Sequence, residues 1–455
     1  MDNTEQINSL IRLGTYLADH SVDGTGSFQA ARDILLRNSP RISGGTLESI
    51  AEGLTPVEAA IKLVLALDSS ALPIQGPPGS GKTYTGAQMI LALLESGRRV
   101  GVIANSHKVI SNLLSELCKA AKKSGSKLQV VQKSNETDGC SEAAVTQVDT
   151  NEKVVEKLRK GEAQVVAGTA WLWSREEMAE SVDVLFVDEA GQMSLANVLA
   201  VSQAANSIVL LGDPQQLDQP QKGVHPPGAE VSALAHLLNG KATIDKDQGL
   251  FLGESWRLPP DICKFTSELF YDDRLESRPE NENQRLNSRS VLDGTGLRFF
   301  PVEHTGNQSE SPEEAARIAE LLGQLLDGEV TWTNKDREIE KLALGDILVV
   351  APYNAQVAAL VEALPEGARV GTVDKFQGQQ APVVLCSMTT STPEDAPRGM
   401  EFLYSSNRLN VATSRAQCLT VLVASPALFE VQCKTPRQME LANAFCRYLE
   451  MAEVI

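Results

Sequence analysis

The stretch Gln75-Gly-Pro-Pro-Gly-Ser-Gly-Lys-Thr83 follows the apolar run Ala71–Ile74 and precedes a helix-like segment, Tyr84–Leu94. Its spacing, Gly76 followed after four residues by Gly81-Lys-Thr83, is typical of a phosphate-binding loop. The glycines let backbone N–H groups curl around anionic oxygens, and the helix that follows directs the positive end of its dipole at them. Because each part suits a chain of phosphates, the sequence predicts a nucleoside triphosphate site here.

The loop also supplies side chains for the phosphates and for a metal ion. Lys82 would reach the β- and γ-phosphates, and the Thr83 hydroxyl would bind Mg²⁺. The residues expected to contact the nucleotide are Gly76, Pro77, Gly79, Ser80, Gly81, Lys82, Thr83 and Tyr84. The alternative is a Gly-rich turn without a ligand, and the strand and helix that flank the loop argue against it.

The composition is that of an ordinary soluble globular protein. Of 455 residues, 42% are hydrophobic and 22% are charged, and this length allows two or three domains. There is no run of about eighteen apolar residues, and the N-terminus lacks the basic and apolar regions of a signal peptide. We therefore expect no membrane partner and a cytoplasmic location.

Cysteine usage and net charge limit the function classes further. The seven cysteines are spread singly, with no C-x-x-C pair, so neither a disulfide framework nor a zinc or iron–sulfur site is expected. The formal charge, 41 minus 59 or −18, argues weakly against a nucleic-acid partner. A nucleic-acid motor needs positive potential only along one groove, so the motifs must decide.

Buried-strand patterns alternate with helical segments along the first half of the chain. Apolar runs at Val100–Ala104, Val165–Thr169, Val182–Val187 and Ile208–Leu211 predict, with the strand before the loop, a parallel sheet covered by helices on both faces. The second half repeats the pattern without a phosphate loop, with strands expected at 346–351, 369–373, 383–388 and 420–424. A polar segment, 276–296, is predicted to be a mobile loop.

These patterns divide the chain into three parts. The expected boundaries are 1–50 for an N-terminal segment of short amphipathic helices, 51–250 for a first lobe with an insertion or small subdomain near 113–161, and 251–455 for a second lobe. The predicted fold class is therefore α/β, with two lobes of which the first binds the nucleotide.

Polar residues follow two of the expected strands, where the ligands of open α/β sheets gather. Asp188 and Glu189 come directly after Val182–Val187, and buried carboxylates are costly unless a cation meets them. With a phosphate loop upstream, that cation would be Mg²⁺. The cluster Asn105–Lys108 follows Val100–Ala104 in the same way, although a solvated loop is the simpler interpretation of it.

Six segments, taken in order, resemble the superfamily 1 helicases, and within them the 1B group that includes the nonsense-mediated-decay helicase and the nuclease-associated replication helicases. The segments are Gln75–Thr83, Asp188-Glu-Ala-Gly-Gln192, Gly212-Asp-Pro-Gln-Gln-Leu217, Glu254-Ser-Trp-Arg257, Val370-Gly-Thr-Val-Asp-Lys-Phe-Gln-Gly378 and Leu409-Asn-Val-Ala-Thr-Ser-Arg-Ala416. They span the chain from about residue 55 to residue 425. The resemblance implies two tandem RecA-like lobes of the P-loop NTPase class, each a parallel sheet covered by helices.

A narrower resemblance concerns Val100–Leu114, which is similar to the helicase half of bacterial proteins that fuse a RecB-like nuclease to such a motor. The rest of the sequence shows no nuclease-like set of Asp and Glu-x-Lys residues. If this narrower resemblance holds, we expect the chain to be the motor alone, with its nuclease in a separate polypeptide.

The family resemblance implies ATP and Mg²⁺ as cofactors and a role for each motif residue. The implied roles are metal binding by Asp188 with Thr83, polarisation of the attacking water by Glu189, sensing of the γ-phosphate by Gln216, and arginine fingers at Arg257 and Arg415. Arginine fingers bring positive charge to the γ-phosphoryl oxygens, which is worth several powers of ten in rate. Lys82 completes the predicted catalytic set. Trp256 and Gln380 occupy positions whose counterparts in relatives contact the adenine and the ribose.

Nucleic acid in this family runs across the tops of both lobes. The candidate contacts are Ser106, His107, Lys108 and Thr169 in the first lobe and Asn354, Thr372 and Lys375 in the second. Hydroxyl and N–H donors at strand ends suit sugar–phosphate contacts, which carry no base specificity. For each candidate, a helix-capping or solvent contact is the competing interpretation.

Three features depart from the family pattern. The glutamine that reads adenine falls, by spacing, at Glu58, whose carboxylate cannot donate a hydrogen bond to N7, so the preference for ATP over other nucleotides stays open. Gln380 stands where relatives carry an acidic residue. The small β-barrel usual before the phosphate loop does not fit into the helical N-terminal segment, so duplex-splitting machinery is expected to be reduced or supplied by a partner.

The resemblance implies an ATP-dependent translocase or helicase on single-stranded nucleic acid that moves 5′ to 3′, and DNA is expected as its substrate ahead of RNA. The alternative is an ATPase switch, in which nucleic-acid-stimulated closure controls a partner nuclease without processive unwinding. A binding module without activity is a third hypothesis. The retention of Lys82, Asp188, Glu189, Arg257 and Arg415 argues against it.

Overall fold

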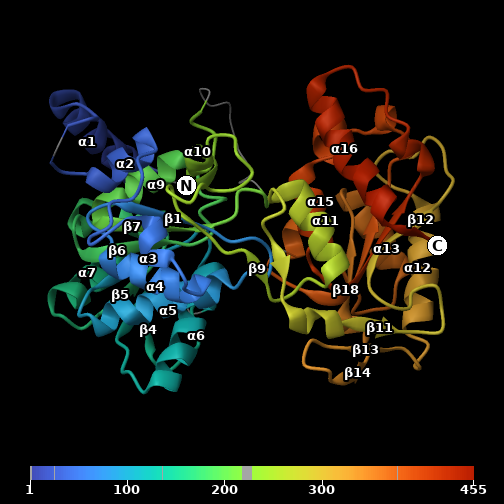
Figure 1. Cartoon of the computed structure of the whole chain (residues 1–455), viewed down its shortest axis with the longest axis horizontal. Helices are drawn as coiled ribbons and strands as arrows, with labels where there is room; N and C mark the ends of the chain where they lie inside the picture. The colour runs from blue at the N-terminus through green and yellow to red at the C-terminus, as the bar shows by residue number, and fades with distance from the viewer. Residues whose placement is uncertain (1–2, 25, 136, 218–227, 377) are drawn as a thin grey trace. The chain divides into compact units, whose positions relative to one another are not determined.

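The computed structural model of the chain describes residues 3–24, 26–135, 137–217, 228–376 and 378–455, which fold into two compact units (Figure 1). The first unit contains Met1–Pro77, Gly81–Pro214 and Asp218–Leu252, and the second contains Pro78–Ser80, Gln215–Leu217 and Gly253–Ile455. Each unit has its own parallel sheet and its own hydrophobic core. Gln377, within the predicted Val370–Gly378 motif, lies outside the described residues.

The first unit is built on an eight-stranded sheet in the order β4-β3-β5-β2-β6-β7-β1-β8, in which neighbouring strands are parallel. The strands are β1 (Ala71–Gln75), β2 (Val100–Ile103), β3 (Val130–Lys133), β4 (Val145–Val148), β5 (Val165–Ala167), β6 (Val182–Val187), β7 (Ala205–Gly212) and β8 (Leu250–Phe251). Strands covered on both faces are expected to be apolar along their whole length, and β1 and β2 are buried at every position. The predicted parallel sheet is confirmed.

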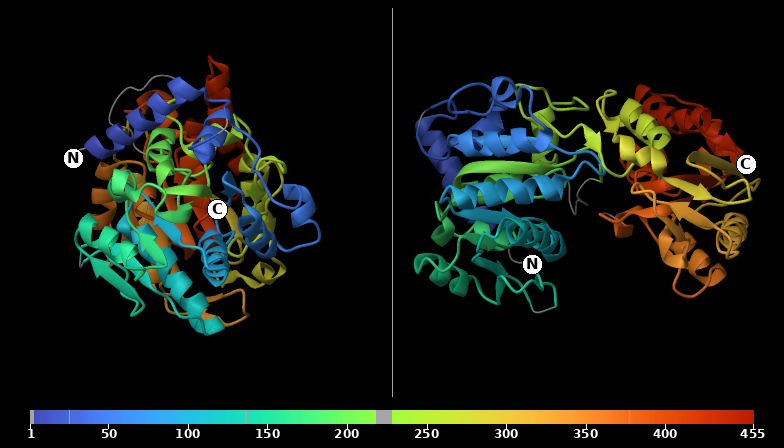
Figure 2. Two further views of the ribbon diagram at one scale, coloured as in Figure 1. Left: turned by 90° about the vertical axis from the view of Figure 1, so that its left-hand side faces the viewer. Right: turned by 60° about the horizontal axis from the view of Figure 1, so that its bottom comes forward.

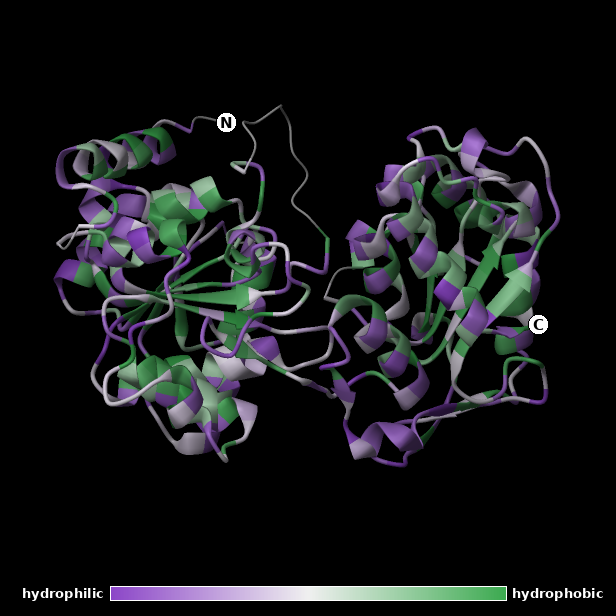
Figure 3. Ribbon diagram, turned by 45° about the horizontal axis from the view of Figure 1, so that its top comes forward, coloured by the Kyte–Doolittle hydropathy of each residue, from purple (hydrophilic) through white to green (hydrophobic). Residues whose placement is uncertain are grey.

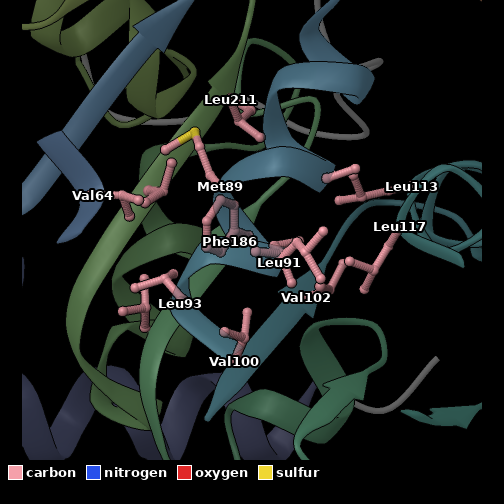
Figure 4. Close-up of a cluster of buried hydrophobic side chains, with 14 of the residues drawn as sticks. Val64, Met89, Leu91, Leu93, Val100, Val102, Leu113, Leu117, Phe186 and Leu211 are labelled. Atoms are coloured by element: carbon pink, nitrogen blue, oxygen red, sulfur yellow. The ribbon is translucent and has the colours of Figure 1, made fainter. Parts of the chain in front are cut away.

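Helices cover both faces of this sheet, as Figure 2 shows. They are α1 (Thr4–His20), α2 (Gln29–Leu36), α3 (Leu47–Ala51), α4 (Pro56–Ala66), α5 (Lys82–Glu95), α6 (His107–Ser124), α7 (Asn151–Arg159), α8 (Ala170–Trp173), α9 (Leu195–Val201) and α10 (Ala233–Leu238). On one face, α4, α5 and α6 contribute Val64, Met89 and Leu113 to a cluster with the strands (Figure 4). On the other face, α1 and α2 contribute Leu13 and Ile34 to a second cluster. The strands are accordingly the most hydrophobic part of the ribbon (Figure 3).

The segment near 113–161 extends the sheet and does not form a separate subdomain. After α6, β3 and β4 pair in parallel with each other, and β3 pairs with β5 of the main sheet. The two strands are short and each has only two valines, and the charged helix α7 that follows them has one buried residue, Val154. The apolar pattern of these edge strands is therefore weak in the sequence.

The N-terminal helices pack onto the first unit. Of the helices expected over residues 1–50, α1 is longer than predicted, with 17 residues, whereas α2 and α3 are short. The Nε2 atom of Gln203 donates to the carbonyl oxygen of Ser9 at 2.6 Å. The Nη2 atom of Arg12 donates to the carbonyl oxygen of Ser174 at 3.1 Å. These contacts tie α1 to the segments around α8 and α9.

The second unit has a six-stranded parallel sheet in the order β16-β15-β17-β18-β12-β19. Its strands are β12 (Gly296–Pro301), β15 (Ile347–Val350), β16 (Arg369–Gly371), β17 (Ala381–Ser387), β18 (Ala416–Ala424) and β19 (Glu453–Val454). The helices are α11 (Pro260–Phe270), α12 (Pro312–Leu325), α13 (Asn354–Ala363), α14 (Met400–Leu403), α15 (Ser406–Thr413) and α16 (Pro436–Met451). The repeat of the α/β pattern is confirmed, with β12 and β19 as strands that the sequence pattern did not predict.

The prediction of a mobile loop over residues 276–296 is wrong. This segment contains β10 (Glu276–Ser277), which pairs with β9 (Glu254–Ser255), and β11 (Arg285–Asn287). β11 joins β13 (Thr331–Thr333) and β14 (Ile339–Lys341) in an antiparallel sheet of three strands. Leu286 and Leu292, both fully buried, anchor the segment in the core of the second unit. Because polar residues surround these two leucines in the sequence, the sequence pattern did not identify them as core residues.

One further feature concerns the chain as a whole. Among the residues that the structure describes, no helix has both the length and the apolar character needed to cross a membrane.

Candidate functional site

The phosphate-binding loop connects β1 to α5 at the carboxyl edge of the first sheet. Gly79 and Gly81 have φ of 74° and 78°, in the left-handed region that favours glycine. The backbone N–H of Gly76 donates to the carbonyl oxygen of Gly212 at 2.9 Å, which fastens the start of the loop to the end of β7. Because α5 begins at Lys82, its first N–H groups stand at the loop, where an anion is favoured.

Two polar groups of this loop fit a phosphate ligand. Lys82 Nζ donates to the carbonyl oxygen of Gly76, so the ammonium folds back over the loop. Ser80 Oγ is buried and has no hydrogen-bond partner among the described residues. A buried hydroxyl without a partner is uncommon in a folded protein and calls for a ligand or water. The loop therefore fits the triphosphate that its sequence predicts.

The acidic pair lies at the end of β6, two strands from β1 in the same sheet. Asp188 is 5% exposed, and its Oδ1 atom accepts from the backbone N–H of Glu189 at 2.9 Å. Burial raises the pKa of Asp188 and the adjacent Glu189 raises it further, while the charge of Lys82 opposes the shift. A buried carboxylate of this kind ionises readily only beside a cation. Asp188 with the hydroxyl of Thr83 is an oxygen donor set of the kind that suits Mg²⁺.

Two glycines hold the loop after β6 against the end of β7. A Cβ atom on Gly191 would lie 2.4 Å from the carbonyl oxygen of Asp213, and one on Gly212 would lie 2.4 Å from the backbone nitrogen of Gly191. The N–H of Ala190 donates to the carbonyl oxygen of Leu211 at 2.8 Å. The glycines of the Asp-Glu-Ala-Gly-Gln and Gly-Asp-Pro-Gln-Gln-Leu motifs are thus required by close backbone packing.

The first-unit candidates for nucleic-acid contact lie at the ends of β2 and β5. The Ser106 hydroxyl accepts from the N–H of Val109 at 3.3 Å and so caps α6, which is the competing interpretation considered for it. Lys108 is exposed, and the Thr169 hydroxyl makes no capping bond to α8. Burial lowers the pKa of His107, and the nearby charge of Lys133 lowers it further.

Lys133 is a basic residue at this edge that the sequence analysis missed. It is the last residue of β3, inside the segment treated as an insertion. The signal was present, because Lys133 follows an apolar pair, Val130-Val131, in the pattern of a buried strand with a polar end.

In the second unit the two predicted arginine fingers are neighbours. Arg257 Nε donates to Gln380 Oε1 at 2.8 Å, and its Nη1 donates to the carbonyl oxygen of Ser414 at 3.2 Å. Arg415 Nη1 lies 3.5 Å from the carbonyl oxygen of Gln379. Burial lowers the pKa of Arg257, and the charge of Arg415 lowers it further. These contacts of Arg257 are with neutral oxygens, so the two positive charges favour an anion beside them.

Residues 78–80, which belong to the second unit, pack against the bend after β9 that carries Trp256 and Arg257. The N–H of Trp256 donates to the carbonyl oxygen of Gly79 at 2.9 Å, and a Cβ atom on Gly79 would lie 2.7 Å from the Cβ atom of Arg257. The Trp256 ring is 48% exposed, with the guanidinium of Arg278 at 4.2 Å from its centroid. A base that stacks on this ring would therefore meet Arg278.

Gln216 lies in a short segment that α15 supports. The side chain of Asn410, on α15, donates from Nδ2 to the carbonyl oxygen of Gln215 at 2.8 Å. Gln216 itself is 4% exposed. Because α15 leads directly to Arg415, one helix positions both the segment that holds the predicted γ-phosphate sensor and one predicted finger.

The second-unit candidates for nucleic-acid contact also gather at one edge. Asn354 begins α13 after β15, and Thr372 follows β16, which is adjacent to β15 in the sheet. Lys375 Nζ donates to the carbonyl oxygen of Val370 at 2.7 Å, and its side chain crosses Gly371, where a Cβ atom would lie 2.4 Å from Lys375 Cδ. The ammonium retains two further donors for a phosphate.

Glu58 has a structural role at the start of α4. Its Oε2 atom accepts from the backbone N–H of Thr55 at 2.9 Å and from the Thr55 hydroxyl at 2.8 Å, which completes a capping box. These hydrogen bonds lower the pKa of Glu58. The position that relatives use to read adenine is occupied here by a helix cap.

Comparison with known proteins gives two adjoining matches to models described as AAA domain, over residues 58–227 and 230–427. The DNA polymerase alpha-associated DNA helicase A of Schizosaccharomyces pombe is 25% identical over 78% of this chain and 61% of its own length. The DNA replication ATP-dependent helicase/nuclease JHS1 of Arabidopsis thaliana is 26% identical over 81% of this chain and 28% of its own length. The probable RNA helicase armi of Drosophila melanogaster is 27% identical over 54% and 24%, respectively. The chain thus spans less than two thirds of each of these relatives.

Proposed function

We propose that the chain is an ATP-driven motor of the superfamily 1 helicase type, acting on single-stranded nucleic acid, with its two AAA-domain matches as the ATPase domains. The observation that carries the proposal is the phosphate loop together with the acidic residues after β6. The loop contains a buried hydroxyl, Ser80 Oγ, without a partner among the described residues, and the charge of Lys82 acts on the pKa of the buried Asp188. Phosphoryl transfer needs positive charge at the phosphates and a carboxylate pair for the metal and the water.

The residues divide this work as follows. Lys82 and the backbone N–H groups of the loop bind phosphate oxygens, and Thr83 and Asp188 would hold Mg²⁺, which neutralises charge on the phosphates when bound. Glu189 orients the attacking water. The second unit contributes Gln216, Arg257 and Arg415 to hydrolysis. The neutral hydrogen bonds of Arg257 support this role, because they orient its guanidinium without cancelling its charge.

For the track we propose single-stranded DNA before RNA, with movement from 5′ to 3′. Support for DNA comes from the names of two of the relatives reported above, and the name of the third refers to RNA. Contact with the sugar–phosphate backbone through Lys108, Thr169, Asn354, Thr372 and Lys375 would serve either polymer, because phosphates and hydroxyl donors carry no base identity.

A second candidate function is an ATPase switch for a nuclease. The similarity to a protein named as a helicase/nuclease favours it, since the chain spans 28% of that protein. The narrower likeness of Val100–Leu114 to motors fused with a RecB-like nuclease agrees with the same idea. In this case nucleic-acid-stimulated hydrolysis would control the partner without processive unwinding.

The test is steady-state ATPase activity with and without oligo(dT) or oligo(U), followed by unwinding of duplexes with a 5′ or a 3′ single-stranded tail. The proposal expects stimulation by oligonucleotide and unwinding of the 5′-tailed duplex. Stimulation without unwinding would favour the switch. Hydrolysis that ignores both oligonucleotides would contradict both functions.

A further inference from the structure

Two arginines of the second unit lie against a single aromatic ring. The guanidinium of Arg398 is 3.8 Å from the centroid of Phe402, and that of Arg408 is 4.5 Å from it. Phe402 is half-buried on α14, and the ring of Tyr353 lies 5.5 Å away. Contacts of this kind hold a guanidinium in a fixed plane while its N–H donors stay available.

The two arginines differ in their ion pairs. Arg408 pairs with Asp374 at 3.2 Å, whereas Arg398 is exposed and forms no ion pair within the part of the chain that the structure describes. Lys375 follows Asp374 directly in the chain, and Glu401 precedes Phe402. An exposed guanidinium without an ion pair favours an anion beside it.

The patch adjoins the edge already considered for nucleic acid. Tyr353, which contacts Phe402, immediately precedes Asn354, and Asp374, which pairs with Arg408, lies between Thr372 and Lys375. The arginines therefore continue the row of polar groups at the ends of β15 and β16. None of them is in a segment that the sequence motifs identified for nucleic acid.

A buried polar network fixes the loop that leads to Arg398. Thr389, just after β17, has φ of 72°, a conformation that is strained for a β-branched residue. Its N–H donates at 2.8 Å to Glu314 Oε2, and the fully buried Glu314 also contacts His304 Nε2 at 3.0 Å. His304 Nδ1 in turn contacts Ser391 Oγ at 2.8 Å. Strained backbone held this firmly is typical of segments that present functional groups.

We propose that Arg398 and Arg408, aligned by the Phe402 ring, form a binding site for the phosphates of a single-stranded nucleic acid on the second unit. The inference rests on the proposed function and extends it to residues outside the known motifs. Arginine suits this task because its planar fork matches phosphate geometry. Arg398 is the decisive residue, since Arg408 already has a carboxylate partner and Arg398 has only the ring.

The test is fluorescence anisotropy of labelled oligo(dT) across a range of KCl concentrations, with the full chain. Arg398→Ala should weaken binding roughly tenfold and lower the slope of log K against log salt by about one unit. Arg398→Lys should keep the slope and lose part of the affinity, because the charge remains but the planar fork is lost. Phe402→Leu keeps apolar bulk without a ring and should weaken binding by roughly threefold.

Arg289→Ala is the matched control, because Arg289 has a side chain 91% exposed and lies in the loop after β11. Only variants whose thermal unfolding midpoint equals that of the wild-type chain are compared, so that loss of fold is not mistaken for loss of binding. Equal affinity and slope for Arg398→Ala and Arg289→Ala would overturn this inference alone. A wild-type chain that binds neither oligo(dT) nor oligo(U) would contradict the proposed function as well, and this outcome separates the two failures.

Discussion

Glu189 combines two unusual features, a position directly after a buried aspartate and a left-handed backbone with φ of 53°. Such a conformation costs a non-glycine residue on the order of 1–3 kcal/mol. The hydrogen bond from its own N–H to Asp188 Oδ1 helps to hold it. The strain is explained if the turn aims two successive carboxylates at different tasks, Asp188 at the metal and Glu189 at the water.

The first prediction separates these two tasks. Glu189→Gln should lower the rate of ATP hydrolysis by orders of magnitude and leave nucleotide affinity nearly unchanged, because an amide preserves size but cannot polarise water. Single-turnover hydrolysis and equilibrium binding of Mg²⁺–ATP measure the two quantities. Retained turnover would remove Glu189 from the proposed role.

A second prediction concerns Glu58, whose carboxylate is engaged in the capping box of α4. Glu58→Ala should leave the ratio of ATP to GTP affinity unchanged, measured by competition binding. Thr55→Ala, which removes the other half of the same cap, should lower the free energy of unfolding by about 1 kcal/mol. A change in nucleotide preference on Glu58→Ala would show that this side chain reads the base after all.

At the level of elements, the site depends on how closely neighbouring strand ends pack. The charge of Lys82 acts on Asp188, in the loop after β6, because β6, β7 and β1 are adjacent and parallel and their carboxyl ends share one edge. Gly191 and Gly212 allow the backbones after β6 and β7 to touch. The acidic pair is thus positioned by backbone contact as well as by its strand.

The third prediction tests this contact with a pair of Gly→Ala substitutions. Gly191→Ala places a Cβ atom 2.4 Å from a backbone oxygen, and it should lower the free energy of unfolding by roughly 1–3 kcal/mol and reduce turnover. Gly323→Ala is the control, because nothing lies within 4 Å of the new Cβ atom on the exposed side of α12. It should stabilise the chain by roughly 0.5–1 kcal/mol. Chemical denaturation measures both, and equal effects would contradict the packing argument.

The sequence predicts elements best where burial is complete on both faces. β1, β2, β6 and β15 were found from continuous apolar runs. β12 was missed because Arg298 interrupts an apolar stretch that begins at Gly296 and ends at Pro301. β11 was missed because its single buried side chain, Leu286, lies among polar residues. Strands of this kind are stabilised by packing against a neighbouring strand, which the local sequence does not show.

The same limit applies to the site. The phosphate loop and the acidic pair carry their chemistry in consecutive residues, so spacing alone predicts them. The arginine–aromatic patch combines the distant Tyr353 with Arg398, Phe402 and Arg408, whose spacing matches no motif that indicates a binding site. The helix cap at Glu58 could be predicted from the sequence, because Thr55 is followed three residues later by an acid. The position of Glu58 in the family pattern favoured a role in reading adenine instead.

At the scale of the whole molecule, the proposed reaction uses residues from both units. Lys82, Thr83 and the acidic pair belong to the first unit, while residues 78–80 of the loop, Arg257, Arg415 and the candidate phosphate contacts of the second sheet belong to the second. We therefore expect that ATP turnover and nucleic-acid binding can be impaired separately by substitutions in the second unit alone.

The fourth prediction compares two such substitutions. Arg415→Ala should retain most of the affinity for Mg²⁺–ATP and lose about 10³-fold or more in turnover, because a finger acts on the transition state. Lys375→Ala should weaken oligo(dT) binding and lower its salt slope by about one unit, because a phosphate contact is lost. Turnover and anisotropy are measured on both variants. An equal loss of turnover in both variants would assign Lys375 to the nucleotide site. The proposed nucleic-acid contacts on the second sheet would then have to change.

The central claim is that hydrolysis drives movement along a single strand, and streptavidin displacement tests it directly. Oligonucleotides biotinylated at either the 3′ or the 5′ end are blocked with streptavidin, and release is followed after ATP is added. The account predicts ATP-dependent release from the 3′ end, little release from the 5′ end, and none with Glu189→Gln. Stimulated hydrolysis that releases streptavidin from neither end would contradict it.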